Sequence, residues 1–128
     1  MDKFKNGYDL EERTAKFGEE IITFCRTVKK DPIIFPVITQ LIRSATSIGA
    51  NYMEANGASS PKDFSNKIYI CKKEALESKH WLRMLKSYYP DQKEHLKRYW
   101  QEAHEFSLIF HKIVTTLKNK NLKINSKF

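Results

Sequence analysis

The sequence is poor in cysteine, glycine and proline, and it lacks a long hydrophobic run. Its two cysteines, Cys25 and Cys71, are far apart in the 128 residues and form no CxxC pair, which is typical of reduced thiols in a cytosolic protein. No stretch approaches the roughly 18 apolar residues that a membrane-spanning helix requires, and the first residues lack the apolar core of a signal peptide. We therefore expect a cytoplasmic protein that has no structural disulfide and does not associate with membranes.

Charge is also nearly absent from one long segment. Residues 32–60 contain two charged side chains, Arg43 and Glu54, although 30% of the whole chain is charged. A helix on the surface of a small domain normally keeps a charged face toward water, so this segment should be shielded on more than one side. Shielding by a second subunit is the leading interpretation.

The net charge of +8 comes entirely from the second half of the chain. Residues 1–60 carry eight Lys or Arg and eight Asp or Glu, whereas residues 61–128 carry fifteen and seven. This asymmetry favours an electrostatic partner such as nucleic acid, although many proteins of this charge bind none. The length fits a single domain over residues 1–128.

Helix start and stop signals divide the chain into four segments. Asp9 and Glu12 have the spacing of a capping box, and Ser60 precedes Pro61 as an N-cap residue would, with Asp63 three positions after it. The other boundaries are marked by Pro32, Pro36, Gly57 and Pro90. The predicted helices span about residues 10–30, 36–56, 61–89 and 91–118, and the basic tail, residues 119–128, is expected to fray.

Within each segment, apolar residues recur at alternating intervals of three and four, and no stretch shows the two-residue alternation of a strand. The expected core positions of the second helix are Ile38, Leu41, Ala45, Ile48, Tyr52 and Ala55. Those of the fourth are Leu96, Tyr99, Ala103, Phe106, Phe110, Ile113 and Leu117. Because the connections are short, neighbouring helices should be antiparallel, which predicts an all-α, up-down-up-down four-helix bundle.

One face of the second predicted helix is polar but nearly uncharged. It holds Gln40, Arg43, Ser44, Ser47, Asn51 and Glu54. Gly49 lies in the same helix, where glycine costs about 1 kcal/mol relative to alanine, so a close helix approach is expected there. Such a strip is typical of a surface that contacts other protein.

The same segment carries a family resemblance. The run QLIRSATSIGANYMEA, residues 40–55, resembles the signature of the bacterial four-helix-bundle proteins encoded in intervening sequences of 23S ribosomal RNA genes. Similar residues continue to Leu85, and they include Ser60, Asp63, Phe64, Lys67, Lys73, Glu74, Ala75, Glu77, Trp81 and Leu82. Two positions depart from the pattern, because the family often has glycine where Ala45 stands and arginine where Met53 stands. The absent cation at Met53 weakens the transfer of any charged contact there.

The resemblance implies a four-helix bundle that assembles into a homo-oligomeric ring, with a homopentamer as the expected form, and it implies no catalytic activity. Accessory proteins of diversity-generating retroelements are similar in fold, form comparable rings and are thought to engage nucleic acid and a reverse transcriptase.

The polar strip has three interpretations. In the first, Arg43 pairs within the chain with Glu54, Glu74 or Glu77, while Ser47 and Asn51 satisfy each other and backbone groups. In the second, the network crosses a subunit interface and fixes the register of the ring. A ligand site is the third. The candidate network comprises Gln40, Arg43, Ser47, Asn51, Glu54, Glu74 and Glu77.

Two basic faces are candidate contacts for a nucleic-acid backbone. The basic face of the third predicted helix comprises Lys72, Lys79, Arg83 and Lys86, within an arc of about 60°. That of the fourth comprises Lys93, Lys97, Lys112 and Lys118, interrupted by Glu94, Gln101 and Glu105. Phosphate contacts of this kind would be salt-dependent and would carry no sequence specificity.

No catalytic, cofactor or metal site is expected. The chain has one Glu-x-x-His pair, Glu77 and His80, but His80 falls on the far side of the helix from Leu82 and cannot face a bundle interior. We therefore expect a non-enzymatic protein that associates with itself and with RNA or DNA. The alternative is a protein-protein scaffold or an accessory subunit, for example of a retroelement reverse transcriptase, without a direct nucleic-acid function.

Overall fold

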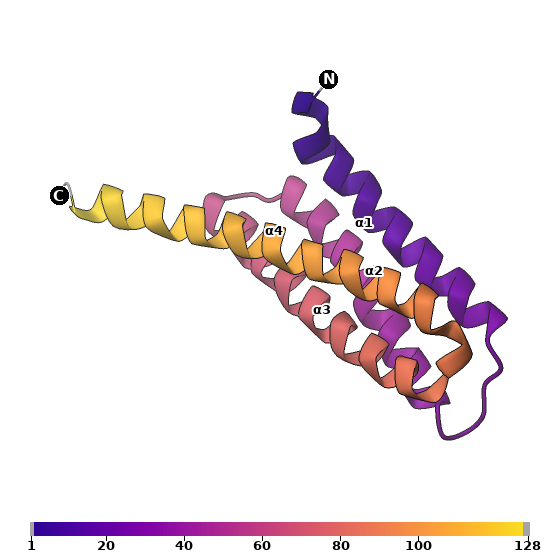
Figure 1. Cartoon of the computed structure of the whole chain (residues 1–128). Coiled ribbons are helices and arrows are strands. Elements are labelled where there is room, and N and C mark those ends of the chain that lie inside the picture. Colours follow the sequence, from indigo (N-terminus) through magenta and orange to yellow (C-terminus); the bar gives the residue numbers. More distant parts are fainter. Residues whose placement is uncertain (1, 127–128) are drawn as a thin grey trace.

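A computed structural model describes the backbone of residues 2–126 and the side chains of residues 10–120. Within this part the chain is all-helical (Figure 1). The elements are α1 (Asp2–Thr27), α2 (Phe35–Asn56), α3 (Pro61–Tyr88), the short 3-10 helix η1 (Pro90–Gln92) and α4 (Lys93–Ser126). Consecutive long helices pack closely against one another, whereas the backbones of α1 and α4 approach each other less closely, and their terminal ends diverge (Figure 1).

The boundary of α3 follows the capping signal in the sequence. The Ser60 hydroxyl accepts a hydrogen bond from the Asp63 backbone N–H at 3.0 Å, and Pro61 occupies the first turn, where its missing N–H costs nothing. At the start of α2, Asp31 performs a similar role one turn earlier. Its carboxylate accepts the backbone N–H groups of Ile33 and Ile34 at 2.9 and 3.0 Å.

The predicted boundaries of the first helix and the predicted end of the fourth were wrong. The capping box at Asp9 does not begin a helix, because α1 already starts at Asp2, and it ends at Thr27 rather than near residue 30. The tail does not fray from residue 119, because α4 continues to Ser126 (Figure 1). Neither proline nor glycine occurs after Pro90, so the sequence contains no residue that stops the helix. Residues 127–128 lie outside the described part.

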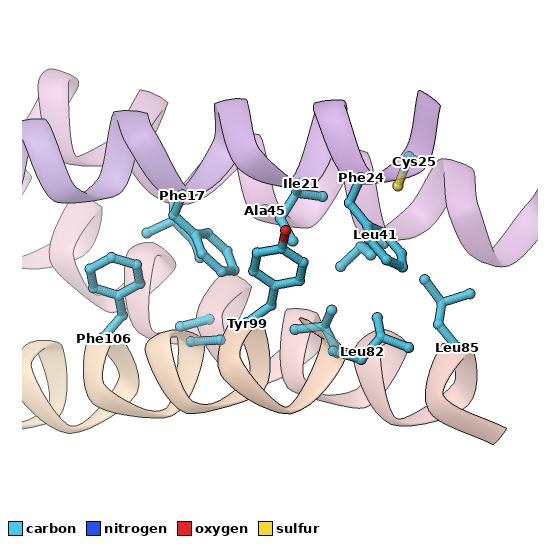
Figure 2. Close-up of a cluster of buried hydrophobic side chains, with 14 of the residues drawn as sticks. Phe17, Ile21, Phe24, Cys25, Leu41, Ala45, Leu82, Leu85, Tyr99 and Phe106 are labelled. Carbon is cyan, nitrogen blue, oxygen red and sulfur yellow. The ribbon is translucent and has the colours of Figure 1, made fainter. Parts of the chain in front are cut away.

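The core lies where the periodicity placed it (Figure 2). All six expected positions of α2 are buried, and Leu96, Tyr99, Ala103, Phe106 and Phe110 of α4 are buried with them. The last two positions expected in α4, Ile113 and Leu117, are only half-buried. Aromatic rings bridge α1 and α4, whose backbones approach each other less closely. Phe17 of α1 meets Phe106 edge-on with ring centroids 5.5 Å apart, and Phe24 meets Tyr99 in the same way at 5.6 Å.

Gly49 permits the close approach that its position predicted. A Cβ atom at this site would lie 3.4 Å from the backbone carbonyl of Thr14, so α1 and α2 are close together here. In the described part, no helix is both long enough and apolar enough to cross a lipid bilayer.

Candidate nucleic-acid interface

Arg43 joins α2 to α3 through two carboxylates. Its guanidinium Nη1 donates to Glu74 Oε2 at 2.8 Å, Nη2 donates to Glu77, and Nε donates to Gln40 Oε1 at 3.1 Å. Trp81 donates its indole N–H to the same Glu77 oxygen at 2.9 Å. The side chain of Glu74 is only 10% exposed, whereas that of Arg43 is 45% exposed. The cation therefore neutralises an almost buried carboxylate from the surface side.

The contacts around Arg43 and Glu77 favour the charged form of both groups. Burial raises the pKa of the Glu77 carboxyl, but hydrogen bonds from Trp81 and Arg43 outweigh it, so this pKa lies below its ordinary value. The hydrogen bond to Glu77 is also the main reason why the pKa of Arg43 lies above its ordinary value. Both groups are therefore held in their charged forms.

The rest of the polar strip forms separate local contacts. Asn51 Nδ2 donates to the Ser47 carbonyl at 2.9 Å, and Glu54 accepts from Lys67 Nζ at 2.8 Å rather than from Arg43. Of the three carboxylates expected for Arg43, the structure thus brings Glu74 and Glu77 to it and gives Glu54 another cation. All these pairings lie within one chain; the subunit-crossing network stays a prediction.

One member of the strip is not on the surface at all. Ser44 is fully buried, and its hydroxyl lies 2.9 Å from the hydroxyl of Ser78, which is also fully buried. Sequence analysis placed Ser44 on the polar face and did not pair it with Ser78. A small polar residue at a core position of each of two neighbouring helices is the signal that could have found this pair.

Arg13 binds the carboxylates of α4 in the same way that Arg43 binds those of α3. It donates to Glu102 at 2.6 and 3.2 Å and to Glu105 at 3.3 Å. Glu105 was expected to interrupt the basic face of α4. It instead pairs with Arg13 of α1.

A groove between α3 and α4 gathers four of the eight predicted basic residues. It has a volume of about 540 Å³, and no carboxylate is among its lining residues. It is lined by Leu82, Arg83, Lys86, Lys93, Leu96, Lys97 and Trp100. The buried leucines form its floor, and the four cations are exposed at its edges.

The basic row continues along α3 beyond this groove. Lys79 Nζ lies 2.9 Å from His104 Nδ1, and Lys72 Nζ lies 3.1 Å from His111 Nδ1. His104 stacks on Trp100 with ring planes 14° apart, and Lys79 also lies over the Trp100 ring, 4.7 Å from its centroid. Trp100 is therefore engaged by protein groups and is not a bare platform for a nucleobase.

The remaining two predicted cations lie further along α4. Lys112 and Lys118 are exposed, and neither lines the groove. Sequence reasoning missed His104 and His111. Their seven-residue separation equals that of Lys72 and Lys79 on α3, and this matched spacing is the signal that could have revealed them.

The described residues offer little for other chemistry. They contain no group of three or more His, Cys, Asp or Glu side chains that could hold a metal ion. Burial raises the pKa of Cys25 to about 11 and that of Cys71 to about 12, so neither thiol is activated as a nucleophile.

Comparison with known proteins adds a family. A sequence profile of the 23S rRNA-intervening sequence protein family matches residues 8–107. Among solved structures, the chain is similar to a protein of unknown function from the S23 ribosomal protein family of Bacteroides thetaiotaomicron VPI-5482. The two sequences are 28% identical, the TM-score is 0.77, and the match covers 86% of this chain and 98% of the other. No functionally curated protein matches.

Proposed function

The chain belongs to the 23S rRNA-intervening sequence protein family, and from that premise we propose that it is a non-enzymatic, cytoplasmic protein that binds RNA or DNA through the phosphate backbone. The observation that carries this proposal is the α3–α4 groove, in which four cations line a depression without a carboxylate. Nucleic-acid phosphates are the anions that such a row of cations fits best.

The pairing of the carboxylates supports this assignment. In α3, Glu74 and Glu77 pair with Arg43 of α2, and in α4, Glu102 and Glu105 pair with Arg13 of α1. Four of the seven acidic residues of the basic half therefore bind cations of the neutral half. Positive charge is left in excess on the surface between α3 and α4.

The binding would be electrostatic and tolerant of sequence. The groove presents ammonium and guanidinium groups, which contact phosphate oxygens, and its one aromatic ring is already covered by Lys79 and His104. We therefore expect similar affinity for unrelated sequences and a steep loss of affinity with salt.

We further propose that the helices are antiparallel in up-down-up-down order. The contacts between helices run in opposite senses along the chain, which supports this topology. From α2 to α3, Ser44 meets Ser78, and Glu54 meets Lys67. From α1 to α4, Phe17 meets Phe106, and Phe24 meets Tyr99.

A homo-oligomeric ring, with a homopentamer as the expected form, is part of the proposal. A second groove, of about 420 Å³, lies between α1 and α2, and in it Ile22 and Met53 are 41% and 57% exposed. Apolar side chains at this exposure favour contact with another protein surface. Each added copy would bring a further net charge of +8, which would strengthen the field around bound nucleic acid.

Binding of a fluorescent single-stranded RNA and of an unrelated duplex DNA, followed by anisotropy over a salt series, tests the nucleic-acid proposal. Reversing Arg83, Lys86, Lys93 and Lys97 to glutamate should weaken binding at low salt by on the order of 100-fold and reduce the salt slope by about three. The matched control places the same charge change on exposed residues outside the groove, at Lys16, Arg26, Lys29 and Lys62. Equal losses in both variants would show that only net charge matters and would reject the groove.

One observation favours the scaffold alternative. Tyr69, Leu76 and Met84 fall on one outer stripe of α3 and are 51%, 45% and 37% exposed. Saturable co-purification of one protein at high salt, abolished by Leu76→Glu, together with no RNA or DNA binding at low salt, would establish the scaffold and replace the proposal above.

A further inference from the structure

Two lysine–histidine pairs repeat along the surface between α3 and α4. Lys79 lies 2.9 Å from Nδ1 of His104, and Lys72 lies 3.1 Å from Nδ1 of His111. The two lysines on α3 are seven residues apart, and so are the two histidines on α4, which is about two turns or 10 Å. The pairs are therefore two copies of one arrangement at nearly the same height on both helices.

The chemistry of each pair fixes the state of the imidazole. A lysine ammonium group has three donors and no acceptor, so a hydrogen bond in this contact requires Nδ1 to accept, which is the imidazole tautomer with its proton on Nε2. If the ring takes up a second proton, Nδ1 becomes a donor. Two cations would then face each other about 3 Å apart with no shared acceptor.

An anion between the two groups would resolve this conflict. A phosphate oxygen accepts hydrogen bonds from both an ammonium and an imidazolium group, and both bonds are charge-assisted. We propose that Lys72–His111 and Lys79–His104 are two phosphate-binding sites for RNA, and that protonation of the two histidines strengthens both. This inference rests on the nucleic-acid function proposed above.

Nearby carboxylates on α3 and α4 are bound to arginines of other helices. On the α3 side, Lys72 and Lys79 face the histidines, while Glu77 is bound to Arg43 of α2. On α4 itself, the carboxylates nearest in sequence to His104 are those bound to Arg13 of α1. Lys112, next to His111, is exposed and adds a positive charge. The flat stack of His104 on Trp100 holds one ring in place.

The direction of the pH dependence follows. Histidine changes charge between about pH 5 and 8. While a ring is neutral, only its lysine attracts phosphate. Each ring that takes up a proton adds a positive charge to the same row. RNA should therefore bind more tightly as pH falls, and by reciprocity bound RNA should favour protonation of both rings.

The test compares two double variants across pH. The probe is an oligouridylate about 20 nucleotides long, and its affinity for the full chain is measured at about pH 5.5 and pH 8 over a salt series. His104→Gln with His111→Gln keeps an acceptor for each lysine but cannot be protonated. The control is His80→Gln with His95→Gln, which alters the other two of the four histidines.

For the wild type and the control, affinity should rise on the order of tenfold at the lower pH, with a salt slope steeper by about 1.4. The His104/His111 variant should lose this gain. Imidazole NMR titrations should show that RNA raises the midpoints of His104 and His111 but not those of His80 and His95. An equal gain in both variants, or unchanged midpoints, overturns the inference while leaving RNA binding intact. Absence of binding at every pH overturns the proposed function and this inference with it.

Discussion

The two sides of α3 use charge in opposite ways. Toward α2, Glu74 and Glu77 meet Arg43, so opposite charges are matched. Toward α4, Lys72 and Lys79 meet imidazole nitrogens, so no opposite charge is present in the pairs. The first side has what a folded chain needs for stability. The second retains attraction for an external anion, and for this reason the α3–α4 side is the one proposed to contact nucleic acid.

The largest expected effect tests directly whether the two sides of α3 contribute differently to stability. Arg43→Ala leaves the nearly buried Glu74 carboxylate without its cation, so the free energy of unfolding should fall by about 2 kcal/mol; Arg43 is itself half exposed, which keeps the loss below that of a fully buried pair. Lys72→Ala should change it by no more than about 0.5 kcal/mol. Urea unfolding followed by circular dichroism measures both. Equal losses would mean that the two sides do not differ in their contribution to stability.

The buried serine pair sharpens the same contrast. Ser44→Ala or Ser78→Ala leaves one buried hydroxyl without its side-chain partner, and each should lower the free energy of unfolding by about 1 kcal/mol. The double variant removes both hydroxyls and should cost little more than either single change, because no orphan remains. A double-mutant cycle in urea would show this coupling. Strictly additive losses would mean that the two hydroxyls do not depend on each other.

Acid should reduce the stability that the α2–α3 side contributes to the fold. Because the pKa of Glu77 lies below its ordinary value in the folded chain, the unfolded chain binds more protons, and stability rises with pH through this range. The contribution is complete above the ordinary carboxyl pKa, 4.5, and is lost as pH falls through the lower folded value. Since the side chain is a third exposed, we expect less than about 1 kcal/mol.

Urea unfolding between about pH 3 and 6 would measure this contribution by comparing the wild type with Glu77→Gln. Glu94→Gln, at an exposed carboxyl of α4, is the control. If Glu77→Gln retained the full acid dependence of the wild type, the protons that destabilise the fold would be taken up elsewhere.

Local rules were sufficient to predict the helices and most of the core. The Ser60 cap and the prolines gave the boundaries of α2 and α3, because these signals act within one turn of the chain. They failed for α1, where Asp9 has capping chemistry but lies inside a helix that starts at Asp2. A capping box marks where a helix can begin, and it cannot show that residues before it are not already helical.

The candidate site was predictable only in part. Arg83, Lys86, Lys93 and Lys97 could be assigned to two faces from helical spacing, but their meeting in one groove depends on the relative height of α3 and α4. The same limit applies to Arg43, for which three carboxylates were equally plausible partners in sequence. Helical periodicity gives the angle of a residue around its own axis. The register between helices is set by packing of the whole core, which no single helix encodes.

The smallest expected effect concerns the exposed ion pair between α2 and α3, in which Lys67 Nζ lies 2.8 Å from Glu54 Oε1. Pairing alone would predict a contribution like that of Arg43, but an exposed pair gains little over its hydrated ions and is screened by salt. Lys67→Met should therefore leave the urea midpoint unchanged at physiological salt and lower it slightly at low salt. A loss as large as that of Arg43→Ala would show that pairing alone sets the strength of the α2–α3 side. The expected near-zero value would assign that strength to the burial of Glu74.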